Sequence, residues 1–165
     1  MTLAADPRPA PPPQRPAALQ PDKPVEFWST AAIRSALESG DIATWKRIAA
    51  ALKRDPYGRT ARQVEEVLEV ARPFGVSKAL WEVLERARTH LEDNERAEVA
   101  RHVKLLMDRS GLHEHEFASR IGVSGEDLAT YLDGSVSPSA SLMIRMRRLS
   151  DRFVRVRNTR AANGN

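Results

Sequence analysis

Arginines are the side chains of this chain whose number and spacing could do chemistry. Seven of them lie within residues 145–160 against one aspartate, so this segment carries a net charge of +6. A second basic run, residues 41–62, holds six lysines and arginines against two aspartates. Cationic groups in such numbers can neutralise phosphates and release their counterions. The pattern therefore favours an anionic partner, and a solvated charged face is the alternative for runs of this kind.

The other reactive side chains do not form a site. Of the four histidines, His113 and His115 flank Glu114, a triplet without the spacing of metal ligands. The chain has no cysteine, which excludes a thiolate metal site and a disulfide. It also has no phosphate-binding glycine loop, dinucleotide fingerprint or nucleophile elbow. The sequence therefore predicts no enzyme and no bound metal or cofactor.

A short segment, residues 111–138, has the pattern of two helices that meet at a tight turn. The expected helices are 114–121 and 125–132. Between them, Gly122 permits a positive φ and Ser124 is a good N-cap. Ala118 is small where the two helices must approach, and Leu128 is spaced to be buried behind the second helix. This pattern is typical of a helix-turn-helix, which presents its second helix to the major groove of DNA.

The segment resembles the Cro/C1-type repressor domain, a large bacterial and phage helix-turn-helix family, over about residues 97–152. Residues 117–124 match the family's first helix and turn, Gly134 closes its second helix, and residues 137–139 start the next helix. The resemblance implies an all-α fold. An N-terminal helical domain would precede a Cro/C1-type domain of the λ-repressor kind, with four to five helices.

The resemblance also implies which residues read bases. In the family, base contacts come from the start of the second helix and from a position one turn later. Here these are Gly125, Glu126 and Thr130, with Ser124 near a phosphate. The chain departs from the family in having Glu114 in place of an amide and a net charge of −4 over residues 111–134. Glu126 could accept a hydrogen bond from cytosine, or Glu126 and its neighbour Asp127 could be caps that suit the helix dipole.

Phosphate contacts are then expected mostly from side chains outside the second helix. The Arg-rich segment 145–160 could follow the DNA backbone or enter a minor groove, and a second basic patch lies at a helix start near residue 60. The expected backbone contacts are Glu114, Arg120, Ser135, Arg145, Arg147, Arg148, Arg59, Arg62 and Lys78, and the expected structural positions are Ala118, Gly122, Leu128 and Gly134.

Composition and turn signals divide the chain into four parts. Residues 1–25 hold eight of the eleven prolines and are expected to be a disordered tail, with binding to a proline-recognising module as the alternative. Residues 26–92 are expected to form a helical domain, 93–153 the Cro/C1-type domain and 154–165 a flexible basic tail.

Within 26–92 the helix boundaries follow from caps and apolar spacing. Ser29 or Thr30 starts a first helix, and Asp41 caps a second whose apolar face begins at Ile42. Further helix starts are expected at Thr60, which forms a capping box with Gln63, at Ser77, and at Asp93 or Asn94.

A short repeat adds another possibility. Residues 75–77 and 122–124 are both Gly-Val-Ser, and both precede a predicted helix. Helices 60–72 and 77–88 could therefore form a second, degenerate helix-turn-helix, or this region could serve dimerisation. A generic helical hairpin with a common turn tripeptide is the alternative.

The sequence therefore predicts a sequence-specific regulator of transcription that binds double-stranded DNA, a repressor by resemblance, acting as a homodimer. No apolar run approaches the ~18 residues of a membrane helix and the N-terminus lacks a secretory apolar region. The expected location is the bacterial cytoplasm, at the nucleoid. The alternative is a protein-binding adaptor or antitoxin-like module that uses the acidic face of the same scaffold.

Overall fold

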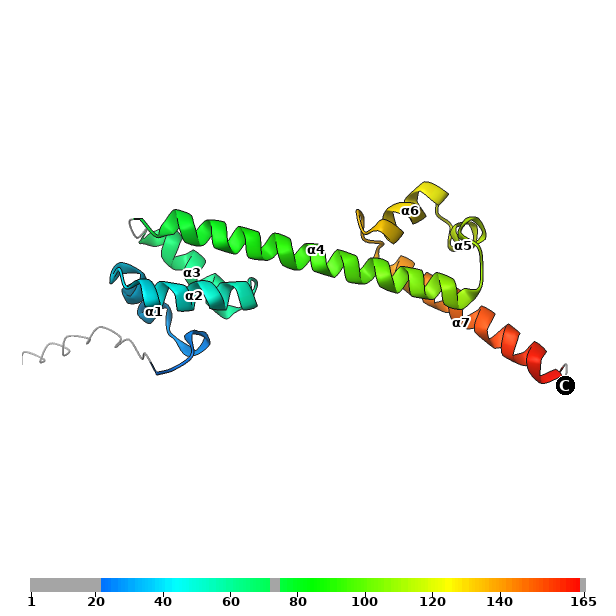
Figure 1. The fold of residues 1–165 in the computed structure, drawn as a ribbon, viewed down its shortest axis with the longest axis horizontal. Helices are drawn as coiled ribbons and strands as arrows, with labels where there is room; N and C mark the ends of the chain where they lie inside the picture. Colours follow the sequence, from blue (N-terminus) through cyan, green and yellow to red (C-terminus); the bar gives the residue numbers. More distant parts are fainter. Residues whose placement is uncertain (1–21, 72–74, 164–165) are drawn as a thin grey trace, which may run out of the picture. The chain divides into compact units, whose positions relative to one another are not determined.

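The structure, a computed structural model, describes residues 22–71 and 75–163, and within them it contains helices and no strand (Figure 1). The predicted all-α class is confirmed. The chain divides into two compact units, one that ends at Arg88 and one that begins at Thr89. Of the helices in the described ranges, none is both long enough and apolar enough to span a bilayer.

The first unit contains a 3-10 turn and three helices, followed by the start of α4. These elements are η1 (Val25–Phe27), α1 (Thr30–Glu38), α2 (Ile42–Arg54), α3 (Arg59–Val70) and α4 (Ser77–Ser110). Two predicted caps are confirmed: the Ser29 hydroxyl accepts from the amide of Ala32, and the Asp41 carboxylate accepts from the amides of Ala43 and Thr44. The Thr44 hydroxyl, helped by both amides, holds the pKa of Asp41 below its usual value.

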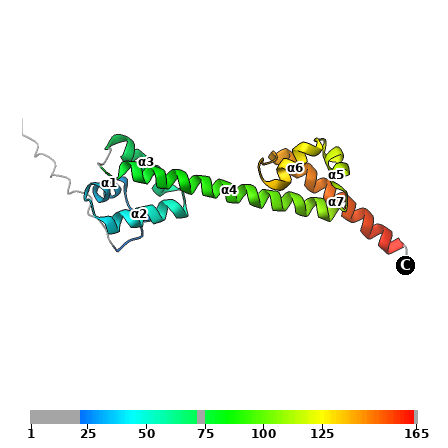
Figure 2. The ribbon, with the colours of Figure 1, turned by 45° about the horizontal axis from the view of Figure 1, so that its top comes forward.

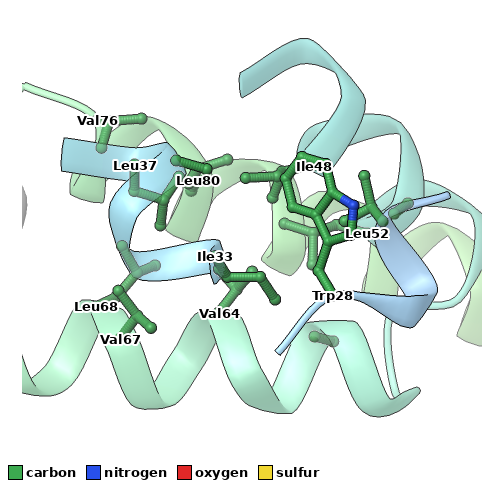
Figure 3. Close-up of a cluster of buried hydrophobic side chains, with 14 of the residues drawn as sticks. Trp28, Ile33, Leu37, Ile48, Leu52, Val64, Val67, Leu68, Val76 and Leu80 are labelled. Atoms are coloured by element: carbon green, nitrogen blue, oxygen red, sulfur yellow. The ribbon is translucent and has the colours of Figure 1, made fainter. Parts of the chain in front are cut away.

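Apolar faces of α1, α2, α3 and α4 meet in one core (Figure 3). The Trp28 side chain is buried in this core, and its indole Nε1 donates to the Lys23 carbonyl at 3.0 Å. Ile42, expected to begin the apolar face of α2, is instead 63% exposed. Burying a large apolar side chain contributes about 1.5–3 kcal/mol, so this core accounts for the association of the four helices. The core side chains labelled in Figure 3 are Trp28, Ile33, Leu37, Ile48, Leu52, Val64, Val67, Leu68, Val76 and Leu80.

The capping box expected at Thr60 is wrong. Helix α3 begins one residue earlier, with Gly58 as its N-cap and no side-chain cap. Thr60 is buried in the first turn, and the Gln63 amide donates to the Trp28 carbonyl at 3.2 Å. Gln63 is therefore engaged by the chain before α1, a contact that local spacing does not indicate.

The helix start expected at Asp93 or Asn94 is also wrong, because α4 continues through both residues. No glycine or proline interrupts residues 77–110. Asp93 forms an ion pair with Arg96, and the Asn94 amide lies 3.1 Å from Nε2 of His90. Because the helix continues, the backbone amides here donate to carbonyls four residues earlier and need no cap, and the two side chains bond along the helix surface instead.

The connection between α3 and α4 differs from the turn that it resembles in sequence. Gly75 and Gly122 both have a φ of 80°. However, residues 71–76 separate α3 from α4, whereas only residues 122–124 separate the two later helices. The sequence also predicts a helix break at Pro73 and Phe74, and these two residues lie outside the described residues. The longer connection favours a generic hairpin over a second helix-turn-helix.

The second unit contains the C-terminal half of α4 together with α5 (Glu114–Ile121), α6 (Gly125–Asp133) and α7 (Ala140–Asn163). In Figures 1 and 2, α5 and α6 lie beside the C-terminal half of α4 and the first part of α7. All four helices contribute to one core. Its buried side chains are Val103, Leu106, Met107, Phe117, Ala118, Ile121, Leu128, Leu142, Met146 and Leu149.

The segment expected to be a flexible tail is helical as far as Asn163. Its Arg157 guanidinium donates to the carbonyls of Arg109 and Ser110, the last residues of α4. Carbonyls at a helix C-terminus have no partner within the helix, and a cation there also suits the helix dipole. Arg157 therefore joins α7 to the end of α4, and the rest of α7 extends past that end (Figures 1 and 2).

The turn between α5 and α6 is made by Gly122, which has a φ of 80° and ψ of 40°. The amides of Gly122 and Val123 both donate to the Ala118 carbonyl, at 3.0 and 3.1 Å. Ser124 then caps α6 in a reciprocal capping box with Asp127. The predicted roles of Gly122 and Ser124 in the turn are confirmed, and together they set the direction of α6.

Two buried serines of the second unit should respond oppositely to replacement by alanine. The Ser150 hydroxyl is buried without a hydrogen-bond partner in the described structure. The Ser110 hydroxyl donates to the Met107 carbonyl and accepts from the Leu112 amide. We expect Ser150→Ala to raise the free energy of unfolding by about 1 kcal/mol and Ser110→Ala to lower it by about as much. Urea denaturation measures both, and a loss of stability in Ser150→Ala would contradict the assignment.

Two glycines at the α5–α6 turn form a second matched pair. Gly122→Ala places a side chain at positive φ, 3.3 Å from the Arg145 guanidinium, and should lower the free energy of unfolding by about 1–2 kcal/mol. An added Cβ at Gly125, the first residue of α6, meets no atom within 4 Å. Gly125→Ala should therefore be neutral or stabilising by up to about 1 kcal/mol. Thermal unfolding of both variants compares them, and equal destabilisation would contradict this account of the turn.

Candidate nucleic-acid interface

The outer side of α6 is not covered by its own unit. Ser124, Gly125, Glu126 and Ala129 are exposed, whereas Leu128 on the opposite side is only 1% exposed. Ala118 is buried where α5 meets the core, as predicted. The hairpin thus buries its apolar side and leaves the start of α6 accessible to a partner.

Hydrogen bonds distinguish the two acidic residues at the start of α6. The Ser124 hydroxyl accepts from the Asp127 amide at 2.9 Å and donates to the Asp127 carboxylate at 2.8 Å. Asp127 is therefore a cap. No hydrogen bond or ion pair involves Glu126 in the described part of the chain. The Thr130 hydroxyl donates to the Asp127 carbonyl at 2.8 Å, so its lone pairs remain available as acceptors.

The predicted backbone contacts on α5 differ in their environment. Glu114 is exposed at the first residue of the helix. Arg120 forms an ion pair with Glu116 at 2.7 Å, and its guanidinium lies 5.0 Å from the centre of the Phe153 ring. An exposed pair of this kind contributes only about 0–1 kcal/mol. Arg120 is consequently held against α7, but a phosphate could compete for it.

Ser135 stabilises the loop that follows α6. Its amide and hydroxyl donate to the Asp133 carboxylate, which lowers the pKa of Asp133, the hydroxyl contributing most. Gly134 ends α6 with a φ of 81°, and a Cβ there would lie 3.6 Å from both the Arg96 carbonyl and the Ala100 side chain. The structure therefore shows Ser135 bound to Asp133. The positive φ favours glycine at position 134, since a Cβ there would make only ordinary contacts with α4.

Arg145 makes a structural contact that its position in a basic run does not suggest. Its guanidinium donates to the Ile121 carbonyl at 2.5 Å, at the C-terminus of α5 and beside Gly122. The contact joins residues that lie 24 positions apart in the sequence, on α7 and α5, so local spacing does not indicate it. Arg145 supports the turn and, among the cationic side chains predicted to contact phosphates, is the one that already donates to a backbone carbonyl in the described structure.

Apart from Arg145 and Arg157, the arginine side chains of α7 are exposed and make no hydrogen bond or ion pair within the described residues. Three of these, Arg148, Arg152 and Arg155, are spaced by four and three residues and therefore share one face of the helix. We call these three residues the basic stripe. Like charges one turn apart repel each other, so the stripe concentrates positive potential for an anion. Helical periodicity from Arg148 could have selected Arg152 and Arg155 from the sequence. Arg147 and Arg160 are also exposed.

The remaining predicted contacts belong to the first unit. Arg59 and Arg62 are exposed in the first turn of α3, and Lys78 is exposed near the start of α4. They do not share a unit with α5 and α6. The candidate interface therefore comprises α6 and the basic stripe.

The surface of α5 and α6 is acidic. Five carboxylates within these helices are exposed and only Arg120 opposes them. Charge is thus segregated within the second unit, with acidic groups on the hairpin and basic groups on α7. The acidic residues are Glu114, Glu116, Glu126, Asp127 and Asp133.

Neither a search for metal-binding clusters nor comparison with known proteins indicates a further chemistry. In residues 22–71 and 75–163, no three His, Asp or Glu side chains are grouped as a metal ion would require. Comparison with family models, curated proteins and solved structures found no match to this chain.

Proposed function

We propose that the second unit is a Cro/C1-type helix-turn-helix domain and that the protein binds double-stranded DNA as a sequence-specific transcriptional regulator, a repressor. The observation that carries this proposal is the exposed start of α6. A left-handed turn and a capping box hold it outward. The same unit supplies free arginines for phosphates.

In this proposal the first turn of α6 enters the major groove, which is about 12 Å wide and admits one helix. The absence of a side chain at Gly125 allows the backbone to approach the base edges closely. Glu126 has no partner in its own unit, and its carboxylate can accept a hydrogen bond from the exocyclic amine of cytosine. Thr130, one turn further on, accepts from a second base.

Affinity must overcome the repulsion between phosphates and the acidic hairpin. The basic stripe and Arg147 offset it by binding phosphates, and each neutralised phosphate releases counterions. Two copies acting as a homodimer would read half-sites about one helical turn apart. A regulator of this kind acts in the cytoplasm, at the nucleoid.

A second candidate is a protein-binding adaptor or antitoxin-like module. Its support is the exposed acidic surface of α5 and α6, which would attract a basic protein and repel a nucleic acid. Binding to duplex DNA distinguishes the two candidates, because an adaptor should show none even at about 50 mM salt.

The basic stripe provides the first test. Replacing Arg148, Arg152 and Arg155 together by alanine should weaken binding to all duplexes alike. It should also reduce the slope of log affinity against log salt by about 0.9 for each phosphate that is no longer neutralised. Fluorescence anisotropy with a labelled random-sequence duplex measures both.

The matched control for this test removes equal charge from the first unit, by alanine at Arg34, Arg54 and Arg86, which are also exposed. The control should retain the affinity and the salt slope of the parent protein. Equal losses of affinity in both triple variants would mean that net charge, and not the stripe, binds the phosphates.

The reading helix provides the second test. We expect Glu126→Ala to relax preference at one base pair by about 1–3 kcal/mol, because it removes the acceptor for cytosine. Selection from a random duplex library, repeated with the variant, measures the change. Glu66→Ala, at an exposed position of α3, is the control and should leave the preference intact. An unchanged preference in Glu126→Ala would show that this side chain does not read bases.

A further inference from the structure

A groove of about 690 Å³ lies along α4 in the second unit, beside Met143 of α7. It contains Leu105, which is 58% exposed and is the most exposed large apolar side chain in the described part of this unit. Val99, half-buried, packs at the same groove. The groove is therefore an apolar surface without a partner inside its own unit, and four charged or titratable side chains line it: Glu95, Glu98, Arg101 and His102.

The charged residues follow an ordered sequence along the helix. Two carboxylates, Glu95 and Glu98, precede the Arg101 guanidinium and the His102 imidazole. None of the four makes a hydrogen bond or an ion pair within the described residues. Elsewhere on the same helix, pairs three or four residues apart do form, as between Arg86 and Glu82. Glu98 and Arg101 have the same kind of spacing and remain unpaired, so both are available to a partner.

We infer that this groove binds a second copy of the chain, with the two α4 helices antiparallel across a twofold axis. An acidic half followed by a basic half becomes self-complementary when one copy is reversed. Glu98 of each copy then faces Arg101 of the other, and Glu95 faces His102. A parallel arrangement would instead place like charges opposite each other, and a foreign partner of one sign would satisfy only half of the row.

The helix presents these groups on one face. Residues 94, 98, 101 and 105 follow each other at steps of four and three, the spacing of a helix–helix seam. In an antiparallel pair centred between residues 99 and 100, each of these four positions lies opposite another member of the same set. Leu105 of one copy then packs near Asn94 of the other, with Met143 at the edge. The twofold contact makes each favourable pair twice, as in other isologous interfaces.

Dimerisation through this groove would supply the homodimer of the proposed function, but it does not require DNA, because the groove involves neither α6 nor the basic stripe. The protein should dimerise without DNA. Sedimentation equilibrium of the full chain over a range of concentrations should give a monomer–dimer equilibrium.

Charge reversal tests the arrangement of the pair. Glu98→Arg and Arg101→Glu should each raise the dimer dissociation constant about tenfold or more, because each places like charges opposite each other twice. An equimolar mixture of these two variants should form a heterodimer. One copy then carries two cationic groups at these positions and the other two carboxylates, so opposite charges face each other at both contacts. The double variant E98R/R101E should dimerise about as well as the parent protein. Lys104→Glu, at an exposed position that does not line the groove, is the control and should leave the dissociation constant unchanged.

Three results would overturn the inference: a parent protein that is monomeric throughout, a dimer that neither single reversal weakens, or a double variant that fails to associate. Circular dichroism establishes that each variant retains its helices before its mass is measured. A monomeric parent that still selects a DNA sequence would reject the groove and the homodimer, and would leave standing the proposal that α6 reads DNA. A protein that dimerises as expected but does not bind DNA would support the groove and reject the proposed function.

Discussion

Reversal of the chain within three residues, between α5 and α6, is the constraint on which the second unit depends. Phe117 and Ile121 must enter the core from one helix and Leu128 from the next, and all three are almost completely buried. An L-residue with a side chain is strained at the φ of 80° that Gly122 adopts, so glycine makes the reversal possible. The capping box then satisfies the amides of Ser124 and Asp127 at the start of α6.

The arginines of α7 have two physical roles. Arg145 and Arg157 donate to carbonyls at the ends of α5 and α4, which have no partners within their own helices. Arg148, Arg152 and Arg155 remain exposed on one face. The same helix thus holds the hairpin in place and provides a cationic surface. As a consequence, a substitution at Arg145 would remove a hydrogen bond that supports the hairpin as well as a positive charge, so it would change binding through both.

Segregation of charge within the second unit affects how strongly the unit binds a charged partner. The acidic hairpin repels phosphates and the basic stripe attracts them, so binding to a nucleic acid requires the attraction from α7 to exceed the repulsion from α5 and α6. The carboxylates also have a local reason to be where they are. Asp127 caps α6, and acidic groups in the first turn suit the positive end of the helix dipole. Helix stability and nucleic-acid affinity therefore make opposite demands on the same few positions.

The sequence by itself determined the helical class, the caps at Ser29, Asp41 and Ser124, and the turn at Gly122, because these depend on side chains within a few residues of each other. Apolar spacing also identified Leu128 as a core residue of the second unit. Only the tertiary structure decided that Gln63 serves the Trp28 carbonyl, that Arg145 and Arg157 serve helix ends, and that Ile42 is exposed. Each of these depends on a contact between distant segments or on which side of a helix the rest of the chain covers. The unbroken α4 has the same explanation, since capping residues such as Asp93 act as caps only where a backbone amide is left without its partner.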